Sequence, residues 1–252
     1  MSNQVPIKAA KVAHEIVELL RELGGARVSE VAEQMDMPTS TAHDYLRTLE
    51  QEEYLVKEGS LYQISTRYLQ LGEQARLRRK AFEVTKPEID ELAEKTGEHA
   101  NLMIEEHGRG VFLYKARGSV AVQLDTHAGM RVPLQTTALG KSMMAHRPRE
   151  EVEAILDRHG MPKVTESTIT SREALFDELD QIRERGYAYD DEERVKGMRC
   201  IAAPIIGENE RAIAAVSVSG PKSRMRKERY TEEVPELVLS SANVVEVNLT
   251  YS

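Results

Sequence analysis

The chain has 252 residues, a formal net charge of −8 and a single cysteine, Cys200. This length accommodates two ordinary domains, and one cysteine excludes both an intrachain disulfide and a cysteine-cluster metal site. No apolar run approaches the roughly 18 residues needed to span a bilayer, and the N-terminus lacks the apolar core of a signal peptide, so we expect a cytoplasmic protein with no membrane contact.

Two short amphipathic helices are predicted near the N-terminus, after a first helix over residues 7–23. From Val28 to Met35, apolar side chains recur at intervals of three and four, as on one face of a helix. Residues 36–38 interrupt the pattern, and the next helix repeats it at Ala42, Tyr45, Leu46 and Leu49. Two helices joined by such a turn are typical of the helix-turn-helix unit, whose second helix can enter the DNA major groove.

The polar face of this second helix carries short side chains that can approach phosphates and base edges. Its candidate DNA contacts are Thr39, Ser40, Thr41, His43, Asp44 and Arg47. Residues 54–56 and 61–64 predict a hairpin, or wing, in which Lys57 and Ser60 are further candidates. A winged helix over residues 1–65 points to a transcription regulator, although the same elements could form an ordinary fragment of a small core.

The charge of this region is unusual for a DNA-binding module. Residues 1–80 contain 11 basic and 12 acidic side chains, so affinity should depend on a few placed contacts and on dimerisation, not on a general positive field. The same balance supports an alternative, a metabolite-sensing module that acts through protein partners and uses its winged helix for docking.

The rest of the chain predicts a linker helix at residues 66–84, with a basic stretch that we interpret as a solvated face, and an α+β domain over residues 85–252. Strands are predicted at 100–105, 111–115, 121–125, 201–206 and 212–219. Helices are predicted at 88–95, 139–146, 150–158, 172–185 and 232–247. This pattern indicates an antiparallel sheet flanked by helices.

Two features of this domain suggest a ligand pocket. Thr137 precedes Ala138 and Leu139 at a predicted helix start, where free N–H groups favour an anion. Ser217 and Ser219 lie two apart on an apolar strand, so both hydroxyls project to one face. Together they describe a pocket for a small carboxylate or polar metabolite. Alternatively, the serines are hydrogen-bonded core residues and Thr137 is only a helix cap.

Other chemistry is weakly supported. The four acids at residues 190–193 lack the alternating pattern of a calcium loop, so we expect a solvated loop there and no metal. Cys200 beside Arg199 could be a reactive thiol, but a lone cysteine next to an apolar strand is more often a buried small side chain. The sequence contains no phosphate-binding glycine loop and no common hydrolase motif. We therefore expect neither an enzyme nor a cofactor.

Three motifs resemble the IclR family of bacterial and archaeal regulators, in the family's order: VPLQTTALGKSMMA (132–145), GYAYDDEERVKGMRCIAAPI (186–205) and AAVSVSGP (214–221). The resemblance covers almost the full chain. It implies a winged helix, a linker helix and an effector-binding domain similar to GAF domains, in dimers or dimers of dimers on pseudo-palindromic operators. It also implies that the effector is bound by Ala138, Leu139, Asp190, Cys200, Ser217 and Ser219.

Two positions depart from the family pattern. Asp44 stands in the middle of the recognition helix, where many members have a basic residue, and leaves Arg47 as the cation on that face. An aspartate can accept a hydrogen bond from cytosine, so DNA binding is still expected. Leu139 replaces smaller residues found in some members, which would narrow the pocket.

Overall fold

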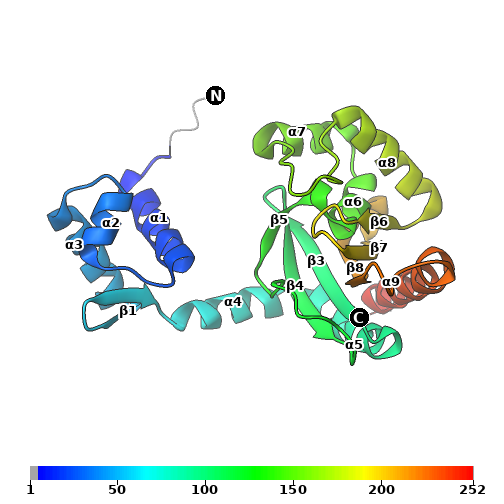
Figure 1. Ribbon diagram of the computed structural model, residues 1–252, viewed down its shortest axis with the longest axis horizontal. Helices are drawn as coiled ribbons and strands as arrows, with labels where there is room; N and C mark the ends of the chain where they lie inside the picture. The colour runs from blue at the N-terminus through cyan, green and yellow to red at the C-terminus, as the bar shows by residue number, and fades with distance from the viewer. Residues whose placement is uncertain (1–4, 252) are drawn as a thin grey trace. The chain divides into compact units, whose positions relative to one another are not determined.

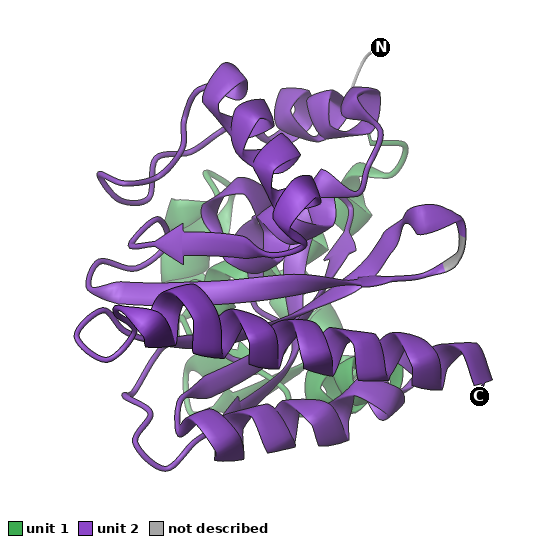
Figure 2. Cartoon of the chain, turned by 90° about the vertical axis from the view of Figure 1, so that its right-hand side faces the viewer, with its two compact units in different colours: residues 1–75 green, residues 76–252 purple. Residues whose placement is uncertain are grey.

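The computed structural model describes residues 5–251. These fall into two compact units, which are divided between residues 75 and 76 (Figures 1 and 2). The first unit contains helices α1 (Lys8–Leu23), α2 (Val28–Gln34) and α3 (Thr39–Gln51), followed by the hairpin strands β1 (Leu55–Glu58) and β2 (Leu61–Ile64). This order of elements confirms the winged helix-turn-helix. No helix within the described residues is long and apolar enough to cross a membrane.

One small hydrophobic core holds the first unit together. Helix α1 contributes Ile16 and Leu20, α3 contributes Ala42 and Leu46, and the hairpin contributes Tyr62, each at most 1% exposed. The spacing of four within each helix places both side chains on one face. The opposite face of α3 is therefore left to solvent.

The linker prediction is wrong in one respect, because residues 66–84 do not form a single helix. Helix α4 (Arg67–Leu77) and helix α5 (Lys80–Thr96) are separated at residues 78–79. The helix predicted at 88–95 is the C-terminal part of α5, which continues through Pro87. An internal proline removes a helical hydrogen bond, but Phe82 and Ile89, on either side of it, are both buried in the core of the second unit and hold the helix in place.

The second unit is built on a six-stranded antiparallel sheet with the order β5-β4-β3-β8-β7-β6. Its strands are β3 (His99–Glu106), β4 (Arg109–Arg117), β5 (Arg131–Pro133), β6 (Ala188–Asp191), β7 (Met198–Ile206) and β8 (Ala212–Pro221). His107 and Gly108 both have positive φ, as a tight hairpin turn between β3 and β4 requires. Strand β3 also pairs with the distant β8, which places Asn101 opposite Ser217.

Helices cover both faces of this sheet (Figure 2). Helices α5 and α9 (Val234–Tyr251) pack on one face, and α6 (Ala138–Ala145), α7 (Arg149–His159) and α8 (Arg172–Arg185) lie over the other. Neighbouring strand residues supply opposite cores: Leu102 and Val216 face α5 and α9, whereas Met103 and Ala215 face α6. The α+β fold with flanking helices is confirmed.

The strand predictions were less complete. No strand forms at residues 121–125, where the chain is a loop whose carbonyl groups accept hydrogen bonds from side chains of the neighbouring strands, including His99 to Val122 and Lys115 to Leu124. These side-chain bonds replace the ladder that a strand would need. Strands β5 and β6, the short strands at the two edges of the sheet, were missed.

Candidate functional site

The exposed face of α3 is the first candidate site. Of the residues predicted to contact DNA there, Thr39, Ser40, His43, Asp44 and Arg47 are exposed, and Thr41 is half-buried at the edge of the surface. The Asp44 carboxylate is 82% exposed and lies 3.7 Å from the His43 ring. A contact this long and this exposed stabilises little, so both side chains are available to a ligand.

The wing lies beside a cation that sequence reasoning missed. Lys57 is exposed, with its ammonium group 5.0 Å from the centre of the Tyr62 ring. The Ser60 hydroxyl accepts a hydrogen bond from Arg27 Nε at 3.3 Å. Arg27 is exposed and precedes α2, outside both the recognition helix and the strands, so no local pattern marked it.

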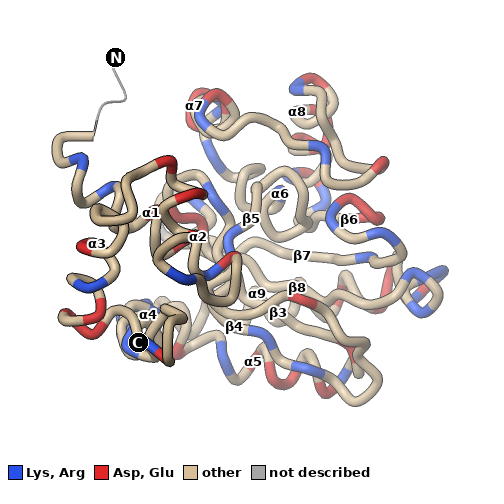
Figure 3. Tube along the Cα trace, turned by 60° about the vertical axis from the view of Figure 1, so that its left-hand side comes forward, with Lys and Arg blue, Asp and Glu red and all other residues tan. Residues whose placement is uncertain are grey.

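Charges of both signs are interspersed along the trace of the first unit (Figure 3). The near balance of 11 basic and 12 acidic residues over residues 1–80 therefore persists in the folded chain as a mixed surface. A protein of this kind obtains DNA affinity from specific contacts more than from nonspecific attraction to phosphates.

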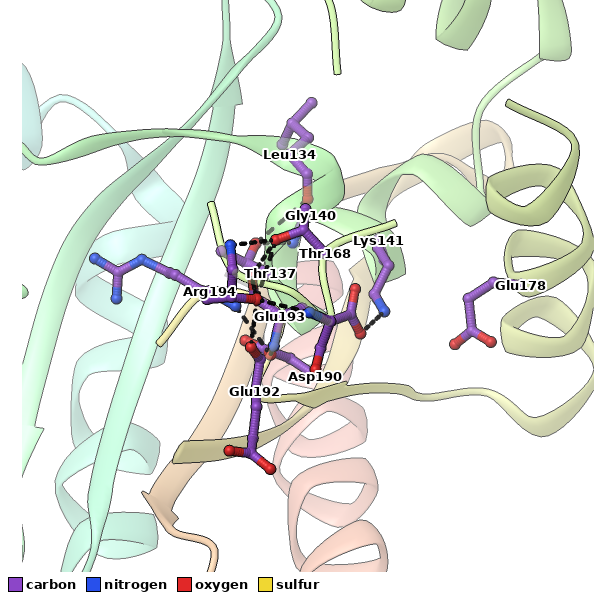
Figure 4. Close-up of polar contacts among 12 residues, drawn as sticks. Leu134, Thr137, Gly140, Lys141, Thr168, Glu178, Asp190, Glu192, Glu193 and Arg194 are labelled. Carbon is purple, nitrogen blue, oxygen red and sulfur yellow. Dashed lines mark hydrogen bonds and ion pairs between the residues drawn. The ribbon is translucent and has the colours of Figure 1, made fainter. Parts of the chain in front are cut away.

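The second candidate site begins at the N-terminus of α6. The Thr137 hydroxyl accepts a hydrogen bond from the Gly140 N–H at 2.9 Å, which confirms Thr137 as the helix cap (Figure 4). A Cβ atom at Gly140 would lie 2.1 Å from the Leu134 carbonyl oxygen, so this approach requires glycine. Within the described chain, the N–H groups of Ala138 and Leu139 have no hydrogen-bond acceptor.

A small cavity opens at this helix start. It is lined by five of the predicted effector residues, namely Thr137, Leu139, Asp190, Cys200 and Ser219, whereas Ala138 and Ser217 are fully buried behind its wall. Sequence reasoning missed other lining residues, among them Asn101, Phe112, Thr126 and Arg194. Asn101, Phe112 and Thr126 come from segments that carry no motif, and only tertiary contacts such as the pairing of β3 with β8 could have indicated them. Arg194 lies within the motif at residues 186–205, but its type and spacing did not mark it as a ligand contact.

Asp190 is the most perturbed acid in the cavity wall. Burial, together with repulsion from Glu193, raises the pKa of Asp190 to about 7, although Lys141 opposes the shift. Its Oδ1 accepts hydrogen bonds from the backbone N–H groups of Glu193 at 2.7 Å and Arg194 at 3.3 Å. Near neutral pH the cavity therefore contains an acid that can gain or lose a proton.

Lys141 and Glu193 form an ion pair beside the cavity (Figure 4). Their side chains are 1% and 10% exposed. Burial raises the pKa of Glu193, and its Oε2 has no partner among the described residues. The Glu193 carbonyl accepts hydrogen bonds from Thr165 and Thr168, at 3.0 and 2.7 Å. The pair thus joins α6 to a firmly held segment after β6.

The expectation of a solvated loop at residues 190–193 is therefore wrong. Asp190 and Glu193 are buried, and Asp191 receives two hydrogen bonds from Arg199, at 2.9 and 2.8 Å. Glu192 pairs with Lys222. Positively charged side chains from other parts of the fold therefore pair with this acidic run and hold it in place. No group of three or more His, Cys, Asp or Glu among residues 5–251 could hold a metal ion.

Cys200 lines the cavity but is not an activated nucleophile. Burial and the neighbouring Asp190 raise the pKa of the Cys200 thiol to about 12. The thiolate is the reactive form of cysteine, so this environment suppresses the chemistry that a thiol enzyme would require.

Comparison with known proteins agrees with this architecture. The family model for the IclR helix-turn-helix domain matches residues 9–59, and that for the bacterial transcriptional regulator IclR C-terminal domain matches residues 74–247. The chain belongs to the IclR family. It is accordingly a ligand-responsive, DNA-binding transcription regulator, from a family of regulators and not of enzymes.

IclR-family relatives cover nearly the whole chain. The probable HTH-type transcriptional regulator ArcR of Halobacterium salinarum is 34% identical over 241 residues, which are 94% of this chain and 92% of that protein. The transcriptional repressor IclR of Escherichia coli is 30% identical over 242 residues, 94% and 87% of the two chains. The crystal structure of Thermotoga maritima IclR matches with a TM-score of 0.76 at 30% identity and covers 97% of this chain and 98% of that one.

Proposed function

We propose that this IclR-family regulator places α3 in the DNA major groove. Thr39, Ser40, Thr41, His43, Asp44 and Arg47 would face base edges and phosphates, while Lys57 and Ser60 of the wing would contact the backbone or the minor groove. The exposure of this face, with Arg27 beside the wing, supports the assignment. Since its target is DNA, we place the protein in the cytoplasm.

We further propose that the chain acts as a dimer, or as a tetramer made of dimers, on a pseudo-palindromic operator. Two recognition helices would then meet half-sites about 34 Å apart, one DNA turn. The lack of a basic surplus in residues 1–80 supports this arrangement, because two weakly binding modules gain affinity when they are linked.

The cavity at α6 is the proposed effector site, for a small carboxylate or a sugar-derived catabolite. The unpaired N–H groups of Ala138 and Leu139 beside the cavity, and the hydroxyl groups of Thr137 and Ser219 in its wall, support a small polar ligand. Asp190 and Cys200 would complete the wall, with Ser217 supporting it from behind.

In this proposal residues 1–65 bind DNA and residues 85–252 bind the effector. Residues 66–84 link these two domains. An effector that binds two dimer arrangements unequally shifts their populations and so changes operator affinity. Such coupling is reciprocal and typically amounts to about 1–3 kcal/mol.

A salt-titrated mobility shift on the upstream region of the chain's own gene tests the proposal. We expect a sequence-selective complex that survives competitor DNA and weakens as salt increases. A lack of selective binding even at low salt would contradict the DNA-reading role and favour docking to a protein partner. Ser219→Ala should weaken the effector response without lowering thermal stability, and an unchanged response would contradict the pocket.

A further inference from the structure

Arg194 is a charged side chain in the cavity that was not among the predicted effector residues, although it lies within the motif at residues 186–205. Two other charged residues, Asp190 and Arg199, line the same cavity. Arg199 is already neutralised by its two hydrogen bonds to Asp191. The carboxylate paired with the Arg194 guanidinium is that of Asp125 at 3.8 Å, which is 74% exposed and therefore well screened by water. The positive charge of Arg194 is thus poorly compensated inside the cavity.

The guanidinium group of Arg194 is held in place but keeps donors free. The side chain is 16% exposed, and Nη1 donates to the Thr126 hydroxyl at 3.1 Å. The Phe112 ring centre lies 5.5 Å from the guanidinium carbon, and Nη2 approaches the Met130 sulfur at 3.2 Å. In Figure 4 the side chain extends away from the Lys141–Glu193 pair. A guanidinium has five N–H donors, of which these neutral contacts use two.

Asp190 does not cancel this charge. Its Oδ1 is occupied by backbone N–H groups, and the charged or titratable side chains around it are Lys141, Glu193, Arg194 and Cys200. Burial keeps much of the Asp190 population protonated near neutral pH. An anion entering beside Arg194 therefore meets a cation and little opposing negative charge.

The remaining polar groups are suited to a second, uncharged group. Asn101 Nδ2 donates to the hydroxyl oxygens of Ser217 at 3.2 Å and Ser219 at 3.3 Å. Both Asn101 and Ser219 line the cavity. These bonds leave the Asn101 amide oxygen and the Ser219 hydroxyl proton to interact with a ligand, because an amide oxygen accepts and a hydroxyl can donate while it accepts.

We propose that Arg194 determines effector class: it binds the carboxylate of a small hydroxy acid, whose hydroxyl group is bound by Asn101 and Ser219. This inference rests on the proposed effector site and decides between its two ligand classes, since a neutral sugar derivative would leave the Arg194 charge poorly compensated in the cavity. A guanidinium and a carboxylate form charge-assisted, bidentate hydrogen bonds, which a neutral amide cannot replace.

Calorimetric titration of the full-length protein with glycolate, lactate, glycerate and gluconate, each beside its neutral amide, tests the proposal. We expect at least one acid to bind about tenfold or more tightly than its amide. Arg194→Gln should weaken binding of that acid about ten- to a hundredfold, leave the amide unchanged and bring the affinity ratio close to one. Arg194→Lys should retain part of the preference for the acid over its amide.

A matched variant separates recognition by Arg194 from a general effect of losing a positive charge. Arg158→Gln removes an exposed charge on α7 and should change neither affinity. A ratio that survives Arg194→Gln, or amides that bind as tightly as acids, would overturn the role of Arg194 while leaving the effector site in place. Failure of every acid and every amide to bind would contradict the site itself.

Discussion

The exposed face of α3 and the cavity at the start of α6, the two candidate sites, are built in opposite ways. The face comes from one helix, between Thr39 and Arg47, and its side chains function by being exposed. The cavity collects residues from β3, β4, α6, β6, β7, β8 and two loops, and its charged groups are withdrawn from water. A helical period is enough to predict a surface of the first kind, whereas a cavity exists only when distant segments meet.

The two regions also differ in how strongly an unpaired charge would destabilise the fold. His43 and Asp44 are exposed and exert a weak, water-screened effect on each other. Lys141 and Glu193 are buried, where an unpaired charge is strongly unfavourable. Substitution of one charged residue should therefore have a small effect on the stability of the first unit and a large effect on the second.

The largest expected effect is that of Lys141→Met. It leaves Glu193 buried without a partner and should lower the free energy of unfolding by about 3–5 kcal/mol, as measured by urea denaturation. The double variant Lys141→Met/Glu193→Leu should recover most of that loss. Asp44→Asn, the control on the exposed face, should stay within about 0.5 kcal/mol of the parent protein. If Lys141→Met proved as stable as the parent, the contrast between the two regions would fail.

A second pair of variants applies one substitution to both units. Gly140→Ala places a Cβ against the Leu134 backbone and should cost about 3 kcal/mol, because the start of α6 must shift. Gly72→Ala lies within α4, where no atom approaches the new methyl group, and should stabilise by up to about 1 kcal/mol. Calorimetric melting temperatures should move in opposite directions, and equal shifts would argue against the packing at α6.

Operator binding and effector binding should respond to substitutions in different units. Arg47→Ala removes the cation on the recognition face and should weaken operator binding by about 1–3 kcal/mol in a mobility shift, without affecting effector binding. Arg21→Ala, which removes an exposed cation of α1 paired with Glu18, is the matched control and should bind as the parent does. A loss of effector binding in Arg47→Ala would show that the two sites do not act in separate units.

The last effect is a gradual pH dependence that belongs to the cavity. Between an unfolded pKa of about 3.9 and a folded pKa of about 7, native Asp190 retains a proton that the unfolded chain releases. Its contribution to stability should therefore decrease as pH rises through this window, by about 1 kcal/mol per pH unit, and level off above it. Asp190→Asn should remove this slope, so that the variant is more stable than the parent at pH 8 but not at pH 4. Parallel stability profiles of the two proteins would contradict the burial of a protonated Asp190.

Sequence reasoning was accurate where one element carries the signal. It identified both helices of the DNA-binding unit, its hairpin and the Thr137 cap, because spacing and capping act over a few residues. It was inaccurate where several elements compete for a segment. The loop at residues 121–125 is held by the side chains of His99 and Lys115, and α5 is held across Pro87 by its buried face.

The sequence by itself determined the two-part organisation, the recognition helix and the α6 start, since each depends on local periodicity or on a motif of adjacent residues. Only the tertiary structure decided the state of the acidic run and the composition of the cavity. Burial beside Lys141 and Glu193 changes the pKa of Asp190, and the pairing of β3 with β8 brings Asn101 to Ser219. Desolvation and contacts between distant residues arise from packing. Packing depends on residues that are far apart in the sequence, so local sequence patterns do not predict it.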